Sequence, residues 1–434
     1  MVLVYTDSKS SRVEYAFGLI FKELLGCKVS ITSDEDEYNS AEGVALWYSS
    51  KKCNRGIQII PAGLLSDRGI NVINPATVIH DDIVSLFPVE MSALPYDPFS
   101  AAFYLVTRYE EYLPFRADMH GRFTAGESFS AKNGFLQIPV VNHYARHVKA
   151  CIQKSYPGFN PPGTQYRFTL TVDVDAAWAM KNKGSLRTAG AIFRDLKKWD
   201  IEALRQRINI LRGKEDDPFD SFNYLFTYQR RRQIEMIFFI LLGDYGRYDK
   251  NINWQNIHFQ DLIKRIGDYA ELGIHPSYDS RNNPGQVKEE IQRLETITRR
   301  KVLKSRQHFL RLDMPATYRT LASMGITEDF TMGFAANVGF RAGICTPYYF
   351  YDLETEQISG LRIFPFAFMD GTLKDYLKKT PQQAKETIDL LIDEVKKVDG
   401  HFIALWHNES LGDKGLWNGW REVCDYMIEK GNTL

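Results

Sequence analysis

The stretch Phe168-Thr-Leu-Thr-Val-Asp-Val-Asp175 joins an apolar, β-branched run to two acidic residues spaced two positions apart. The run predicts a buried strand. Carboxylates at the mouth of such a strand are costly unless a metal, hydrogen bonds or a substrate compensates them. Strand-like stretches further along the chain end in Gly273-Ile-His275 and Leu405-Trp-His407. Acidic and imidazole groups at the ends of separate strands are what a metal-dependent hydrolase on an α/β barrel needs, so the sequence predicts an enzyme.

Length and charge narrow the class of protein. The chain has 434 residues, more than one hydrophobic core usually fills, so two domains are expected. Lys and Arg number 54, as do Asp and Glu, and this balance argues against nucleic acid or an anionic membrane as the main partner. Residues 1–7 lack the basic and apolar segments of a signal peptide, and no apolar run approaches the roughly 20 residues that span a bilayer. We therefore expect a cytoplasmic protein without a transmembrane segment.

The N-terminal third of the chain predicts two regions. Residues 1–95 have the pattern of a small α/β domain, with a helix at 11–25 and strands at 2–5, 27–32, 57–60 and 70–73. Residues 96–164 predict a largely helical connector that ends in a stretch rich in proline and glycine.

Residues 165–434 alternate between strand-like and helix-like stretches. Strands are predicted at 167–173, 235–242, 272–275, 302–309, 361–366 and 401–407. This alternation is typical of a mainly parallel sheet, and about seven strands would form an incomplete (β/α) barrel. The stretch 185–230, rich in Arg and Lys, predicts a helical insertion that acts as a lid or an interface.

Side chains at the carboxyl ends of parallel strands converge on one face of the fold. The predicted strand ends carry Asp173, Asp175, Asp244, His275, Arg306, His308, Asp370 and His407. A divalent metal held by Asp and His polarises a carbonyl and lowers the pKa of a bound water. A nearby free carboxylate can accept the water's proton, and an imidazole can protonate the leaving amine.

This constellation resembles the NodB-type polysaccharide deacetylases, carbohydrate esterase family 4. That family opens with a strand ending in T-F-D-D-G, whose first Asp is a base and whose second Asp is a metal ligand. The counterpart here is Thr171-Val-Asp-Val-Asp175, so the resemblance implies Asp173 as the base and Asp175 as a ligand. The family's last motif, L-x-H, fits Leu405-Trp-His407 and implies His407 as the general acid.

The family's second motif, H-[ST]-x-x-H, supplies two histidine ligands. Here His275-Pro-Ser-Tyr-Asp279 matches only the first, so either Asp279 or His308 is expected as the third ligand. The resemblance is to a bacterial branch of the family that carries an extra N-terminal α/β domain.

The family's arginine motif has two counterparts in this chain. They are Ser305-Arg-Gln-His308 and Gly339-Phe-Arg-Ala-Gly343, which make Arg306 and Arg341 candidates for the site. The stretch Met369-Asp-Gly-Thr372 adds Asp370. Arg306 is expected to stabilise the oxyanion that forms on the substrate.

The resemblance implies a zinc-dependent enzyme that removes an N-acetyl group from an amino sugar or glycan. Two alternatives remain open. A glycoside hydrolase with two carboxylates, such as Asp173 and Asp370, would need no metal. The second alternative is a catalytically silent protein with the same fold that binds or assembles glycans. It stays open because the second histidine of H-x-x-x-H is missing.

Overall fold

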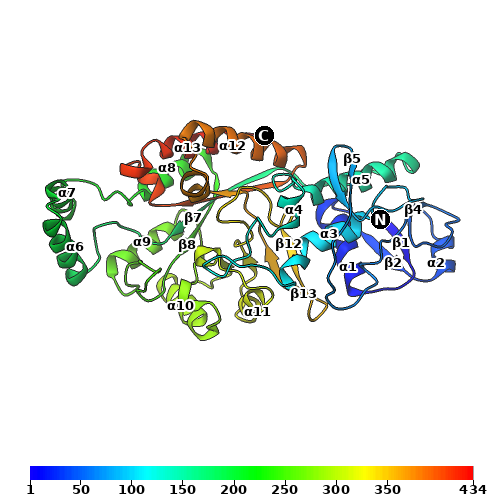
Figure 1. Ribbon diagram of the computed structural model, residues 1–434, viewed down its shortest axis with the longest axis horizontal. Helices are drawn as coiled ribbons and strands as arrows, with labels where there is room; N and C mark the ends of the chain where they lie inside the picture. Colours follow the sequence, from blue (N-terminus) through cyan, green and yellow to red (C-terminus); the bar gives the residue numbers. More distant parts are fainter. Residues whose placement is uncertain (434) are drawn as a thin grey trace.

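The computed structural model describes residues 1–433 and contains two mainly parallel sheets, one toward each end of the molecule (Figure 1). The N-terminal sheet has the order β2-β1-β3-β4 and all of its strand pairs are parallel. Its strands are β1 Val2–Thr6, β2 Val29–Thr32, β3 Val44–Tyr48 and β4 Ile57–Ile59. Helix α1 Ser11–Phe17, continued by a π-helix at Gly18–Leu24, packs against this sheet, and α2 Glu35–Ser40 follows β2.

Two expectations for this region are wrong. Residues 70–73 form no strand, and β3 was not anticipated. β3 is buried at four of its five positions, so its sequence Val-Ala-Leu-Trp-Tyr lacks the alternation that marks a half-buried strand.

Helices fill the space between the two sheets. After the hairpin β5 Thr77–His80 and β6 Ile83–Leu86 come α3 Pro98–Val106, a 3-10 turn at Tyr109–Tyr112, α4 Phe129–Lys132 and α5 Val140–Ser155. All nine residues of α3 are buried. Its start is fixed by Asp97, whose side chain accepts from the backbone N–H groups of Phe99 and Ser100, with Pro98 in the first turn.

The second sheet has nine strands in the order β12-β13-β11-β10-β9-β8-β7-β15-β14. They are β7 Arg167–Val174, β8 Glu235–Ile240, β9 Glu271–Ile274, β10 Lys304–Ser305, β11 Glu328–Asp329, β12 Tyr348–Asp352, β13 Gln357–Ile363, β14 Phe368–Met369 and β15 His401–His407. Only the pair β12–β13 is antiparallel. Within residues 1–433 this order has two ends, so the sheet is open rather than a closed barrel.

The expected number of about seven strands is too low. β10, β11 and β14 have two residues each, which is too short for a pattern of apolar residues to reveal them. The predicted strand 302–309 shrinks to β10, and His308 lies in a 3-10 turn that begins there.

Helices connect the strands of the second sheet. They are α8 Phe222–Arg232, α9 Ile257–Gly267, α10 Pro284–Thr298, α11 Ala316–Ser323 and α12 Pro381–Lys397, and α13 Trp420–Gly431 follows the last strand. Asn283 and Thr380 cap α10 and α12 as expected, the latter with a full capping box. Two more helices, α6 Ser185–Lys197 and α7 Ile201–Leu211, lie at the far end of the molecule from the N-terminal sheet (Figure 1). None of the helices in the described part of the chain is long and apolar enough to span a bilayer.

Candidate metal centre and active site

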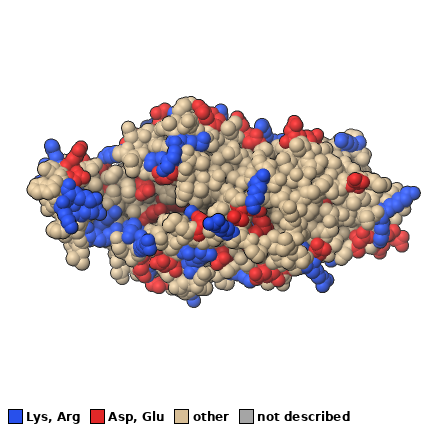
Figure 2. Space-filling model, in the orientation of Figure 1, with Lys and Arg blue, Asp and Glu red and all other residues tan. Residues whose placement is uncertain are grey.

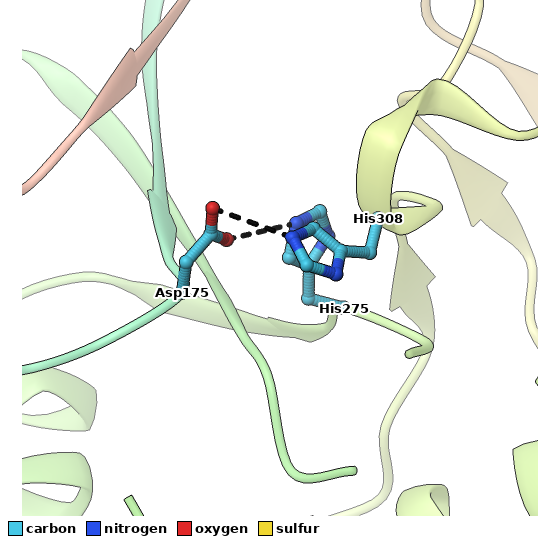
Figure 3. A group of neighbouring side chains, drawn as sticks. All are labelled: Asp175, His275 and His308. Carbon is cyan, nitrogen blue, oxygen red and sulfur yellow. Dashed lines mark ion pairs between the residues drawn. The ribbon is translucent and has the colours of Figure 1, made fainter. Parts of the chain in front are cut away.

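The carboxyl edge of the second sheet brings together an acidic and two imidazole side chains (Figure 3). Asp175 follows β7, His275 follows β9, and His308 begins the turn after β10. The Nε2 atom of His275 lies 3.3 Å from Oδ1 of Asp175, and Nε2 of His308 lies 3.4 Å from Oδ2 of the same carboxylate. Both histidines are buried, whereas the Asp175 side chain is 31% exposed, so the group is open on one side.

Hydrogen bonds to the second ring nitrogen orient both imidazoles. Nδ1 of His275 lies 2.6 Å from the carbonyl oxygen of Arg306, and Nδ1 of His308 lies 2.7 Å from Oδ1 of Asp249. A carbonyl and a carboxylate only accept, so each Nδ1 carries the proton and donates. In the neutral tautomer, the lone pairs of both Nε2 atoms therefore point toward Asp175.

This arrangement fits a divalent cation. Two lone pairs that face a carboxylate repel it unless a proton or a cation lies between them, and Oδ1 of Asp175 is buried with no hydrogen-bond partner in residues 1–433. Tetrahedral ligands at the usual zinc distances of about 2.0–2.2 Å lie roughly 3.3–3.6 Å apart, and the two nitrogen–oxygen distances of 3.3 and 3.4 Å fall in this range. Burial alone would raise the pKa of Asp175, but His308, His275 and His407 hold it well below the usual range.

Asp173 lies next to this group and is held by an arginine from behind. Its Oδ1 accepts from Nη1 of Arg306 at 2.9 Å, and its Oδ2 lies 3.6 Å from Nε2 of His275. Arg306 also donates to Thr171 and to the carbonyl of Phe330, and its guanidinium is fully buried over the ring of Phe239. The salt bridge holds the Asp173 side chain in one orientation.

His407 and Asp370 form the other side of the site. His407 ends β15 opposite Asp173 of β7, so the sheet register places the two residues side by side. Its Nδ1 donates to Oδ1 of Asp370 at 2.7 Å, and its backbone N–H donates to Oδ2 at 2.8 Å. Burial alone would lower the pKa of His407, but Asp370, with Asp175 and Asp173, raises it well above 6.5. This shift favours the protonated imidazole, whose Nε2 lies 3.9 Å from Oδ2 of Asp175.

A cavity of about 190 Å³ joins these groups. Its walls include the three side chains of the cation group, Asp173 and the His407–Asp370 pair. Aromatic and charged side chains complete it, namely Arg122, Asp375, Tyr376, Glu409 and Trp417. The site thus combines a cation-binding group, a carboxylate, a proton donor and a cavity large enough for a small polar group.

Three predicted site residues lie elsewhere. Asp279 is exposed and stands apart from the group, so of the two candidates for a third ligand the structure brings His308 to Asp175 and His275. Arg306 lies behind the site, where it holds Asp173 and is not among the residues that line the cavity. Asp244 is exposed and pairs with Arg293.

Arg341 serves the interior of the molecule rather than the cavity. Its guanidinium donates twice to the carboxylate of Glu111, at 2.9 and 2.6 Å, and Nε of Arg108 donates to the same carboxylate at 2.7 Å. All three side chains are buried. Burial alone would raise the pKa of Glu111, but the two arginines lower it. This triad ties the connecting helices to the second sheet.

Replacing Glu111 by glutamine is expected to lower the free energy of unfolding by about 3–5 kcal/mol, because two buried guanidinium groups lose their shared counter-charge. Urea denaturation followed by circular dichroism measures the change. The matched control is Glu354→Gln, which breaks the exposed pair with Arg319 and is expected to cost less than about 1 kcal/mol. Equal effects of the two substitutions would contradict a structural role for the triad.

Several residues of the site escape prediction from the sequence, among them Asp249, Arg122 and Glu409. Asp249 lies in the loop after β8, five residues beyond the strand-end position Asp244 that the pattern indicates. Arg122 comes from the connector, so nothing local links it to the strand ends. Glu409 follows His407 by two positions, and burial raises the pKa of its carboxyl group. Only Glu409 had a signal in the sequence, its closeness to a candidate histidine.

Asp249→Asn is expected to weaken zinc binding by roughly 10–100-fold without abolishing it, because Asp249 orients His308 and fixes its tautomer. A competition titration with a chromophoric chelator gives the affinity. Asp244→Asn removes a carboxylate from the same loop and should leave the affinity unchanged. If both variants bind zinc as the wild type does, Asp249 has no part in the centre.

Comparisons with known proteins were made on the sequence and on the fold. Residues 2–157 match a family of unknown function, DUF7033, which is less than half of the chain. No curated protein matches this sequence. The matched family covers the N-terminal sheet and the connecting helices but not the second sheet, which was compared with solved structures by its fold.

Solved structures similar to this chain include three that differ in activity. A protein from Mycobacterium smegmatis assigned as a polysaccharide deacetylase is 16% identical with a TM-score of 0.41, over 61% of this chain and 84% of that one. Puue allantoinase is 11% identical with a TM-score of 0.38, over 63% and 89%. A CE4 family pseudoenzyme from Bacillus anthracis is 12% identical with a TM-score of 0.30, over 62% and 60%. The chain is thus distantly similar to deacetylases, an allantoinase and a pseudoenzyme, and its own function is argued from its site.

Proposed function

We propose that this protein is a metal-dependent amide hydrolase that removes an N-acetyl group from an amino sugar. One observation carries the proposal. Two imidazoles whose Nδ1 atoms donate hydrogen bonds elsewhere face one carboxylate at 3.3 and 3.4 Å, beside a second carboxylate and the His407–Asp370 pair. Two imidazoles and a carboxylate form a common ligand set of catalytic zinc. Asp175, His275 and His308 would hold the ion.

The bound cation would polarise the acetyl carbonyl and favour ionisation of a water. Asp173 would accept a proton from the attacking water, since Arg306 holds its carboxylate in place beside His275. The hydroxyl adds to the carbonyl carbon, and the products are acetate and the free amine.

His407 would give its proton to the nitrogen as the carbon–nitrogen bond breaks. An amine anion is a poor leaving group, so cleavage of an amide needs this proton. Asp370 holds the imidazole through both the ring and the backbone, which directs Nε2 toward the cavity. The roles of base and acid thus fall on two groups from neighbouring strands, β7 and β15.

A carbohydrate suits the remaining walls of the cavity. Trp417 and Tyr376 offer aromatic faces, against which the apolar face of a sugar ring can pack, and Glu409, Asp375 and Arg122 offer hydrogen-bond partners for hydroxyl groups. This combination supports an amino sugar over a purely apolar amide.

The geometry disfavours the alternative of a glycoside hydrolase. Both oxygens of Asp370 are engaged by His407, so Asp370 is not free to act on a glycosidic bond. The silent glycan-binding alternative rested on the missing second histidine, and His308 offers an equivalent nitrogen from the turn after β10.

Two measurements on the purified wild type test the proposal. Elemental analysis after dialysis against zinc is expected to find about one zinc per chain, the occupancy of a single site. Incubation with N-acetylglucosamine oligomers and small N-acetylated sugars should release acetate, and a chelator should stop the release. A protein that binds zinc but releases no acetate from any of these sugars would favour the silent binding protein. One that binds no zinc would sink the mechanism.

A further inference from the structure

The hairpin of α6 and α7 exposes an apolar face instead of burying it. Along α6, Leu186 and Phe193 are seven residues apart and lie on one side of the helix, with Leu196 beside them. They are 88%, 69% and 54% exposed. The turn adds Trp199, 85% exposed, and α7 begins with Ile201, 70% exposed. The opposite face of α6 buries Asp195, which pairs with Arg207 of α7.

The hairpin is also the basic part of a chain with no net charge. Residues 185–212 carry seven Lys or Arg and three Asp or Glu, whereas the flanking residues balance, with Lys181, Lys183 and Lys214 against Glu215, Asp216 and Asp217. A cluster of cationic side chains is visible at this end of the molecule (Figure 2). Lys197, Lys198, Arg205 and Arg212 are exposed and form no ion pair with any residue in 1–433. The charge balance of the whole chain therefore hides a local excess of positive charge.

Little of the protein covers the hairpin. Each of its helices packs mainly against the other, and the pair projects beyond the rest of the fold (Figure 1). Contacts with the body include those of Arg187, whose guanidinium donates to the carbonyls of Asn251 and Lys250 and stacks on Tyr245. Leu186 lies beside the body, at a cavity that Trp254 also lines. Phe193, Leu196, Trp199 and Ile201 are exposed and can meet a surface.

We propose that the α6–α7 hairpin binds the surface of an anionic lipid bilayer. An amphipathic helix with large apolar side chains on one side and cations at its borders lies in the interface of a membrane, with its apolar face among the acyl chains. Trp199 at the turn suits the headgroup region, where indole rings concentrate. Lys197, Lys198, Arg205 and Arg212 would contact lipid phosphates. Membrane binding by the hairpin is independent of the proposed hydrolysis.

Charge favours a bilayer over a second copy of the chain. Two hairpins packed face to face would bring two positively charged surfaces together, and like charges brought together in a protein contact oppose association. An anionic bilayer supplies both an apolar layer and the opposite charge. The even composition of the chain argued against a membrane as the main partner, but the tertiary structure gathers its unpaired cations around exposed apolar side chains.

Sedimentation with lipid vesicles tests the inference on the full chain. Vesicles of phosphatidylcholine alone are compared with vesicles of equal parts phosphatidylcholine and phosphatidylglycerol. The apolar variant is Phe193→Ser/Trp199→Ser, and the charge variant is Lys197→Gln/Lys198→Gln/Arg205→Gln. The control Val72→Ser/Leu390→Ser changes two apolar side chains that are equally exposed elsewhere. All of these side chains are exposed, so the variants are expected to fold, which circular dichroism verifies.

The wild type and the control should pellet with the anionic vesicles and not with phosphatidylcholine alone. The apolar and charge variants should each bind at least about tenfold more weakly, and added salt should weaken binding of the wild type. A wild type that stays in the supernatant overturns the inference, as does an apolar variant that binds like the wild type. Self-association that the apolar variant abolishes, without vesicle binding, would assign the face to a second copy instead.

Discussion

Asp175→Ala is expected to remove zinc from the purified protein and to lower kcat/KM for acetate release by a factor on the order of 10³ or more. Asp175 supplies the only carboxylate of the cation group and lies within 3.4 Å of both imidazoles. Without it, two neutral histidines alone face the ion, and no negative charge remains on the group to offset the charge of the metal. Elemental analysis and acetate assays on the same preparation measure both effects.

The matched control for this prediction is Asp279→Ala. Asp279 stands where the H-[ST]-x-x-H motif of the polysaccharide deacetylases has its second histidine. It is exposed and lies outside the cation group. The control should retain zinc and activity. Loss of zinc in Asp279→Ala and retention in Asp175→Ala would reverse the ligand assignment. Asp175 is partly exposed, so its removal leaves the fold intact and the metal measurement can be interpreted.

His407→Gln is expected to retain zinc and to lower kcat by roughly 10²–10⁴-fold, because glutamine has no proton to give to the departing amine. Asp370 raises the pKa of His407 well above its usual range, which favours the imidazolium form that can give this proton. Glutamine is close in size to histidine, and the positions of Asp173 and the cation group should not change. Steady-state kinetics with the best acetylated sugar gives the effect.

Substrates with different leaving groups distinguish two roles of His407, that of a general acid and that of a residue that only shapes the cavity. An acetate ester or an activated anilide leaves without full protonation, so the deficit of His407→Gln should shrink on such substrates. A deficit of the same size on all substrates would contradict the role of acid. The control His258→Gln changes an exposed histidine on α9 and should have no effect on either class of substrate.

Local sequence patterns were sufficient to predict the long strands and helices whose apolar residues recur regularly. β7, β8, β15 and the caps of α10 and α12 lie where alternation, β-branched runs and capping residues indicate them. The strands of two residues were not predicted, because hydrogen bonds to neighbouring strands define them rather than any repeat in the sequence. β3 escaped for a related reason, since it is buried almost throughout and does not alternate.

The sequence by itself determined which residue types stand at the strand ends, because position relative to an apolar run is a local property. Asp173, Asp175, His275 and His407 could all be found in this way. Only the tertiary structure decided between His308 and Asp279 as the third side chain of the group, and it added Asp249 behind His308. Arg306 and Arg341 were candidates for contact with the substrate. The structure shows that they form ion pairs with the buried carboxylates of Asp173 and Glu111.

The physical reason is that a ligand set and a charge pair depend on distances between strands far apart in the chain. Sheet order and register set those distances, and no local pattern encodes them. The same holds for the α6–α7 hairpin. Its apolar repeat is readable in the sequence, but only the fold shows that this repeat faces outward, because burial depends on what the rest of the chain leaves uncovered.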